Sequence, residues 1–150
     1  MKLAEALSIR ADLQKRIAQL KERLKNNSKI QEGDEPAENP KDLFEELDKN
    51  LVELEDLIYR INVTNMQTLH NGVTLTKMIA QKDALTLRVS SMRDVLNSVF
   101  EKEGRYSRQE IKYVRTIDVA ELRKEVDSYS RQLRILDLKI QGINWAVELQ

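Results

Sequence analysis

Apolar residues recur in steps of three and four along four long stretches of this sequence, and this spacing constrains the fold most. The clearest stretch is residues 40–63, where the steps alternate strictly along Phe44, Leu47, Leu51, Leu54, Ile58 and Ile61. Such spacing places the side chains on one stripe of an α-helix and is typical of coiled-coil packing. Leu43 and Leu57 widen this stripe, which indicates contacts with more than one neighbour.

The other three stretches predict helices over residues 2–25, over residues 76–102 and from residue 119 nearly to the C-terminus. Their stripes consist mostly of leucine, isoleucine, valine and methionine: Leu3, Ala6, Leu13, Ile17, Leu20 and Leu24; Met78, Leu85, Val89, Met92, Leu96 and Val99; Val119, Leu122, Val126, Tyr129, Leu133, Leu136, Ile140, Ile143 and Val147. Two charged residues interrupt them. Arg10 is expected at an edge or beside a carboxylate, because a buried arginine needs a partner, and Lys82 interrupts the third stripe.

Start and stop signals lie between the helical stretches. Residues 26–39 break the apolar pattern with Gly33, Pro36 and several asparagines, which predicts a long acidic loop. Asn39 is suited to cap the next helix and Pro40 to begin it. Gly104 ends the third helical stretch, and Asp118 with Glu121 has the spacing of a capping box for the last one.

A small β element is expected between the second and fourth helices. Asn71-Gly72 is a pair typical of tight turns, and residues 62–65 and 73–75 on either side are rich in threonine and β-branched residues. In the segment 111–117, the side chains of Ile111, Tyr113, Arg115 and Ile117 alternate with those of Lys112, Val114 and Thr116, as in a β-strand. This segment is expected to add a third strand to the hairpin. The β element is therefore predicted at about 62–75 and 110–117.

The predicted fold is mainly α: four long antiparallel helices that form one bundle domain over residues 1–150, with a β-hairpin or three-stranded element. Long regular stripes often present more apolar surface than one bundle buries, so a homo-oligomer is the expected state.

Composition excludes several classes of function. With 25 basic and 25 acidic residues the formal net charge is zero, so general binding to nucleic acid is not expected. The absence of cysteine excludes disulfides, thiolate catalysis and cysteine-based metal sites, and one histidine disfavours a histidine metal site. The sequence contains no run of about 18 apolar residues, so no membrane-spanning helix is expected. The N-terminal residues lack the apolar stretch of a secretory signal, so a cytoplasmic location is expected.

Charge is distributed unevenly along the chain. Residues 1–27 contain seven basic and three acidic residues, a net charge of +4, whereas residues 29–56 contain three basic and eleven acidic residues, a net of −8. Residues 57–150 contain fifteen basic and eleven acidic residues, a net of +4. Antiparallel packing of the first two helices would therefore bring opposite charges together.

Three groups of residues are candidates for a site. The acidic loop has a carboxylate cluster that could bind a hard cation, although it lacks the ligand spacing of a calcium loop: Glu32, Asp34, Glu35 and Glu38. A second group could hold a phosphate or carboxylate, or pair with the acidic loop of another subunit: Arg105, Tyr106, Ser107 and Arg108. A polar turn is the third: Asn62, Thr64 and Asn65.

Signatures of enzymes are absent. No serine–histidine–acid arrangement, glycine-rich phosphate loop or paired-histidine helix occurs, and His70 lies in a predicted turn. No catalytic residue, metal or cofactor is therefore expected.

Several short segments stand out as a set along almost the whole chain: Met1-Lys2-Leu3-Ala4-Glu5-Ala6-Leu7, Arg10-Ala11-Asp12-Leu13-Gln14, Gln31-Glu32-Gly33, Pro36-Ala37-Glu38, Ile61-Asn62, Thr64-Asn65, Gly72 with Thr74-Leu75-Thr76, Arg105-Tyr106-Ser107-Arg108 and Asn144-Trp145. In this order and spacing they resemble the septicolysin-like family of small bacterial helical proteins. The function of the family is largely uncharacterised. Its name implies a cytolytic, pore-forming toxin, and the resemblance implies no catalytic residue.

The leading hypothesis is therefore a non-enzymatic helical protein that assembles with copies of itself. One alternative is a membrane-acting cytolysin, as the resemblance implies, which would expose an amphipathic helix face to lipid. The other is a protein that binds a small anion or a metal ion through Arg105, Arg108 and the acidic loop.

Overall fold

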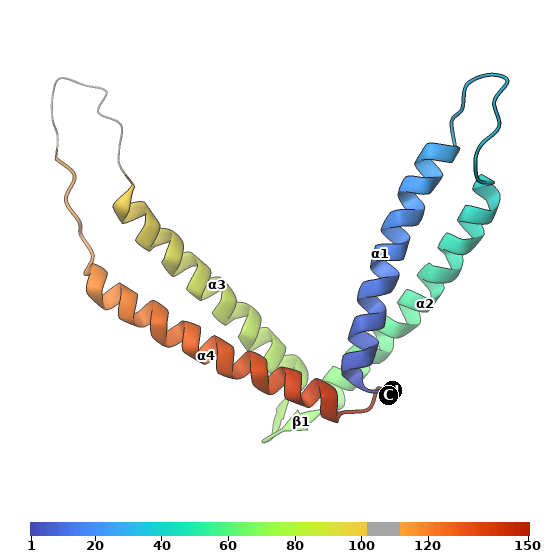
Figure 1. Ribbon diagram of the computed structural model, residues 1–150. Helices are drawn as coiled ribbons and strands as arrows, with labels where there is room; N and C mark the ends of the chain where they lie inside the picture. Colours follow the sequence, from blue (N-terminus) through green and yellow to red (C-terminus); the bar gives the residue numbers. More distant parts are fainter. Residues whose placement is uncertain (102–111) are drawn as a thin grey trace. The chain divides into compact units, whose positions relative to one another are not determined.

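The computed structural model describes residues 1–101 and 112–150, and within them the chain is mainly α-helical. The described elements, labelled in Figure 1, are α1 (Leu3–Asn27), α2 (Pro40–Gln67), β1 (Leu69–His70), β2 (Val73–Thr74), α3 (Leu75–Phe100) and α4 (Val119–Ala146). The predictions of four long helices and of a small β element after the second are confirmed.

Two compact units make up the chain. The first unit comprises Met1–Thr76 and Gln141–Gln150, and the second comprises Lys77–Ile140. The first unit thus contains α1, α2, the β-hairpin and the end of α4, while the second contains most of α3 and α4.

Helices α1 and α2 of the first unit lie side by side along most of their length (Figure 1). Leu20 and Leu24 of α1 form a buried cluster with Leu43 of α2, against which Leu47 packs. Further along the pair, α1 buries Leu3, Ala6 and Leu13, and α2 buries Leu57, Ile61 and Thr64. Burial of each large aliphatic side chain contributes about 1.5–3 kcal/mol, so this contact is the main core of the unit.

The stripe predicted for α2 is confirmed only in part: Ile61 is buried and Leu47 and Leu54 are half-buried, but its other three residues are exposed. Leu43 and Leu57, expected only to widen the stripe, are 3% and 5% exposed, whereas Phe44, Leu51 and Ile58 are 53%, 43% and 37% exposed. The reason is that α2 carries two apolar stripes with the same spacing, offset by one residue or about 100° around the helix. Helix α1 covers one of the two stripes.

The predicted beginning of α2 is confirmed. The Asn39 side chain accepts a hydrogen bond of 3.1 Å from the Lys41 backbone N–H, and Pro40 is the first helical residue. In the preceding loop, the Glu38 backbone N–H donates to the Asn27 side-chain oxygen over 2.9 Å. The end of the loop is therefore held to the last turn of α1.

The turn of the β-hairpin is confirmed, but the position of its first strand is wrong. Asn71 and Gly72 have φ angles of 51° and 78°, the left-handed conformation that tight hairpin turns require. They join β1 and β2, which pair antiparallel with Leu69 opposite Thr74. Residues 62–65, expected to form the first strand, lie instead in α2, because the buried face of that helix continues through Ile61 and Thr64.

The expected third strand is not confirmed. Residues 112–117, the part of that segment within the described residues, form no strand. The Arg115 guanidinium lies over the ring of Phe100 at the end of α3, 4.6 Å from its centroid, and Arg123 of α4 lies 5.1 Å from the same ring. This segment therefore contacts the end of α3 through a cation–π interaction.

Helices α3 and α4 of the second unit run antiparallel and use the predicted stripes. Val89 of α3 and Val126 of α4 are buried, and every predicted stripe residue of α4 is at least half-buried. Lys82, which interrupts the α3 stripe, forms an ion pair with Asp137 of α4, with Nζ and Oδ1 2.6 Å apart. At the other end, the Asp118 carboxylate caps α4 by accepting the Glu121 backbone N–H over 3.0 Å, the first half of the predicted capping box.

Two further polar contacts link α3 to α4. The Arg88 guanidinium donates to the Tyr129 hydroxyl over 2.9 Å and lies 4.8 Å from the centroid of that ring. Arg93 donates to the Ser130 hydroxyl over 3.2 Å. The two helices are therefore connected at three levels by long charged side chains.

Candidate functional site

The acidic loop is exposed except where Glu38 joins it to α1. Arg23 of α1 forms an ion pair with Glu38, and its Nε donates to Oε2 over 3.0 Å. This hydrogen-bonded pair lowers the pKa of the Glu38 carboxyl below its ordinary value. Glu32, Asp34 and Glu35 are exposed. In the described parts of the chain, no three histidine, cysteine, aspartate or glutamate side chains are grouped so that they could hold a metal ion.

The second candidate group lies outside the described residues. It comprises the residues of the predicted anion site, Arg105, Tyr106, Ser107 and Arg108.

The polar turn residues are divided between the core and the surface of α2. Thr64 is 1% exposed, and its hydroxyl donates to the Arg60 carbonyl over 2.8 Å. The same hydroxyl accepts the Gln150 backbone N–H over 3.0 Å. Asn62 is exposed and Asn65 is half-buried. Thr64 therefore holds the C-terminal segment to α2.

This C-terminal segment also pairs with the first residues of the chain. Lys2 and Glu148 form an antiparallel bridge, and the Leu3 backbone N–H donates to the Val147 carbonyl over 2.9 Å. The Lys2 ammonium lies 2.7 Å from the Glu148 carboxylate, and the Met1 ammonium lies 3.0 Å from it. Both contacts lower the pKa of Glu148, the hydrogen bond from Lys2 most of all. The sequence pattern did not indicate this contact, because a two-residue bridge has no periodicity.

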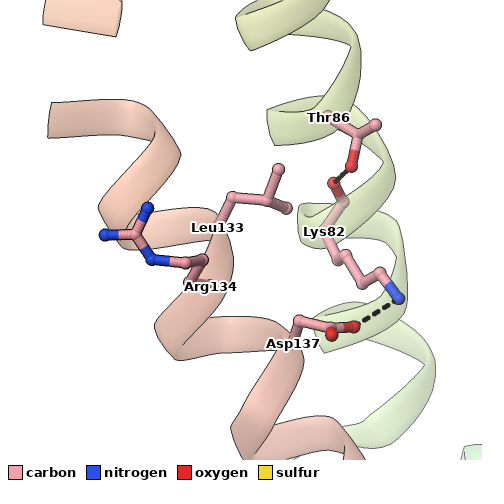
Figure 2. A pocket seen from close by; sticks show the side chains of 5 residues that line it. All are labelled: Lys82, Thr86, Leu133, Arg134 and Asp137. Atoms are coloured by element: carbon pink, nitrogen blue, oxygen red, sulfur yellow. Dashed lines mark hydrogen bonds and ion pairs between the residues drawn. The ribbon is translucent and has the colours of Figure 1, made fainter. Parts of the chain in front are cut away.

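An open pocket of about 280 Å³ lies on the second unit between α3 and α4 (Figure 2). It is lined by Lys82, Thr86, Leu133, Arg134 and Asp137. The Lys82 ammonium is neutralised by Asp137, and the Thr86 hydroxyl donates to the Lys82 carbonyl over 2.9 Å. In Figure 2 the Arg134 guanidinium points away from this ion pair. The Lys82 and Arg134 cationic groups thus do not converge on a common point.

The strongest candidate for an interaction site is an exposed apolar face of α2. We call it the α2 outer face and define it by Phe44, Asp48, Leu51, Glu55 and Ile58. These residues follow each other in steps of four and three, so they lie on one line along the helix. All five are exposed.

A second exposed row flanks the α2 outer face on the same helix: Val52, Tyr59 and Met66, which are 68%, 68% and 59% exposed. On α1, by contrast, Ile9 at 38% is the one large apolar side chain exposed to this degree. The sequence contained the signal for this difference, because Phe44, Leu51 and Ile58 repeat every seven residues beside the buried leucines. What the sequence did not show is which of the two stripes α1 covers.

Among the helices within residues 1–101 and 112–150, none has the length and apolar character needed to cross a membrane. The exposed apolar side chains are instead interspersed with charged ones along amphipathic helices.

The chain was also compared with known proteins. Residues 10–149 match a protein family described as a family of unknown function, DUF6847. The fold is similar to the crystal structure of a functionally unknown conserved protein from Corynebacterium diphtheriae, with a TM-score of 0.93. The two sequences are 42% identical, and the match covers 100% of this chain and 99% of the other. No curated protein matches the chain.

Proposed function

The chain belongs to DUF6847, a family of unknown function, and we propose that it is a non-enzymatic protein that assembles with copies of itself through its helices. The observation that carries this proposal is the α2 outer face. Its three apolar side chains, Phe44, Leu51 and Ile58, are 37–53% exposed although they repeat with the spacing of a packing surface.

An apolar row of this kind is unfavourable in water. Each Å² of apolar surface removed from water contributes roughly 25 cal/mol, so covering the row would stabilise the protein. Monomeric proteins rarely expose apolar patches larger than a few hundred Å², and larger ones mark interaction surfaces. Helix α2 already buries one stripe against α1, so its second stripe is suited to a second helical partner.

Charge favours a copy of this chain over a lipid surface as that partner. Asp48 and Glu55 lie within the α2 outer face, and residues 29–56 carry a net charge of −8. Helices that bind anionic membranes carry lysine and arginine beside their apolar face, which is the opposite arrangement. The second unit of the same chain, Lys77–Ile140, contains 14 basic and 10 acidic residues, so a copy supplies a surface of opposite net charge.

In this proposal the four-helix bundle expected from the sequence forms between copies. Two helices come from the first unit of one chain and two from the second unit of another.

The experiment that tests the proposal is native mass spectrometry, with multi-angle light scattering at micromolar concentration. We expect the wild-type protein to have a mass that is a multiple of 17.5 kDa. Leu51→Glu places a charge in the middle of the α2 outer face and is expected to reduce the mass to that of the monomer. Circular dichroism shows whether the helices are retained in this variant.

A matched control uses the β-hairpin. Leu69 is 65% exposed in β1, so Leu69→Glu introduces the same charge at an exposed leucine outside the α2 outer face. We expect this variant to keep the mass of the wild type. A wild-type protein that is a folded monomer at micromolar concentration overturns the proposal, as does an oligomer that Leu51→Glu leaves intact.

A further inference from the structure

Helix α4 has an exposed row with the same geometry as the α2 outer face. We call it the α4 outer face and define it by Lys124, Ser128, Arg131, Ile135 and Leu138. The steps are again four and three, and all five side chains are exposed, Ile135 to 54% and Leu138 to 67%. The stripe of α4 that faces α3, which includes Val126 and Leu133, is a separate one.

The two outer faces carry opposite charges. The α2 outer face contains two carboxylates, Asp48 and Glu55, and no basic residue, whereas the α4 outer face contains Lys124 and Arg131 and no acidic residue. Within the described residues, none of these four side chains forms an ion pair. Each face is therefore apolar, charged with one sign and unpartnered.

The positions of these charges match in one register. Asp48 and Glu55 are seven residues apart, and so are Arg131 and Lys124, which corresponds to about 10 Å along each helix. If the helices run antiparallel with Asp48 opposite Arg131, then Glu55 lies opposite Lys124. In the same register Phe44 lies opposite Ile135, and the small Ser128 lies opposite Leu51.

We infer that the α2 outer face of one copy binds the α4 outer face of a second copy, antiparallel, with Asp48 paired to Arg131 and Glu55 paired to Lys124. This inference rests on the proposed self-assembly and specifies which two helix faces meet in it. Each chain has both faces, so every copy can contribute one face to each of two such contacts. The contact of Phe44 with Ile135 and the covering of Leu51 by Ser128 supply the apolar part of the affinity, and the charges set the direction and register of the helices.

The test reverses the charges of each face separately. One variant carries Asp48→Lys and Glu55→Lys, and the other carries Lys124→Glu and Arg131→Glu. Each variant alone places like charges opposite each other, so its dissociation constant is expected to rise at least about tenfold, as measured by analytical ultracentrifugation. An equimolar mixture is expected to associate, because every contact between the two variants then joins opposite charges again.

A control variant changes the net charge by the same amount elsewhere on α2. Glu45→Lys with Glu53→Lys alters two exposed carboxylates outside the α2 outer face, and we expect its dissociation constant to stay within about twofold of the wild type. Circular dichroism of each variant confirms that the helices are formed. Restored association in the mixture also shows that loss in the separate variants is not caused by misfolding.

The outcomes distinguish this inference from the proposed function. If the wild type assembles and the charge-reversed variants assemble equally well, the contact inferred here is wrong and the self-assembly stands. If the mixture does not associate and rescue requires all four substitutions in the same chain, the contact between copies is also wrong. A monomeric wild type overturns the proposed function and this inference together.

Discussion

In the α1–α2 pair, leucines of one helix pack against leucines of the other, whereas the α3–α4 pair is bridged at three levels by arginine or lysine. Leu20 and Leu24 lie against Leu43 in the first pair. In the second, Lys82 contacts Asp137 and Arg88 contacts Tyr129. Both pairs derive from apolar residues in steps of three and four, so the spacing alone does not determine how a helix pair is held together. The residue types that interrupt the stripe matter as much.

The largest effect is expected in the leucine cluster of the first pair. Leu20 is 1% exposed, and Leu20→Ala leaves a cavity where its side chain was. We expect the free energy of unfolding to fall by about 2–5 kcal/mol, measured by urea denaturation. Leu87→Ala on α3 is the control, because Leu87 is 67% exposed, and its effect is expected within about 0.5 kcal/mol. Equal losses in the two variants would contradict the assignment of the main core to α1 and α2.

An intermediate effect is expected at the helix caps, where the two pairs should behave alike. Asn39 caps α2 and Asp118 caps α4 through the same kind of side-chain hydrogen bond. Asn39→Ala and Asp118→Ala are each expected to lower the free energy of unfolding by about 1 kcal/mol, because each leaves a backbone N–H without its acceptor. Asn39→Asp and Asp118→Asn keep an acceptor oxygen and should cost little. If the alanine variants match these controls, the caps do not contribute to stability.

A smaller effect is expected for the ion pair that bridges the second pair of helices. Lys82→Met removes a charge whose side chain is 37% exposed and keeps most of its length. We expect the free energy of unfolding to change by less than about 1 kcal/mol, because water and salt screen a partly exposed pair. Urea denaturation at low and high salt measures it. A loss of several kcal/mol would mean that polar bridges, and not Val89 and Val126, hold α3 to α4.

The smallest effect is expected for the change of thermal stability at acidic pH. The pKa of Glu38 is lowered by Arg23, and that of Glu148 by Lys2 and the amino terminus, from an ordinary value of 4.5. A carboxyl whose pKa is lower in the folded state stabilises the protein above pH 4.5, and this contribution is lost as the pH falls through the folded pKa. Both groups belong to the first unit. We therefore expect the Tm of the wild type to fall more steeply below pH 4.5 than that of the Glu38→Gln and Glu148→Gln double variant. Parallel Tm curves would show that these pairs do not contribute.

The helices were predictable because their signals are local and repeated. Asn39 and Pro40 mark the beginning of α2 through short-range hydrogen bonding, and Asn71-Gly72 marks the hairpin through its backbone conformation. The first strand was misplaced because residues 62–65 have β-branched side chains, but Ile61 and Thr64 continue the buried face of α2. Tertiary packing of this kind overrides local preference, and it is not visible in a segment considered alone.

The candidate site was predictable only in part. Thr64 was recognised as a polar residue at the end of an apolar helix, but its partner is the Gln150 backbone, 86 residues away. The two stripes of α2 were both visible as Leu43 beside Phe44. Which of them stays exposed depends on the position of α1, which is a property of the pair of helices. Contacts distant in sequence therefore account for most of what the pattern missed.

The hydrogen bond from Leu3 to Val147 has a consequence for the order of folding. The first unit needs Gln141–Gln150, so α1 and α2 leave the ribosome long before their last contacts exist, while the whole second unit is synthesised in between. Contacts that close such long loops form late, since the chain entropy that they restrict is large. The first unit of the nascent protein therefore stays incomplete until Gln141–Gln150 have been synthesised.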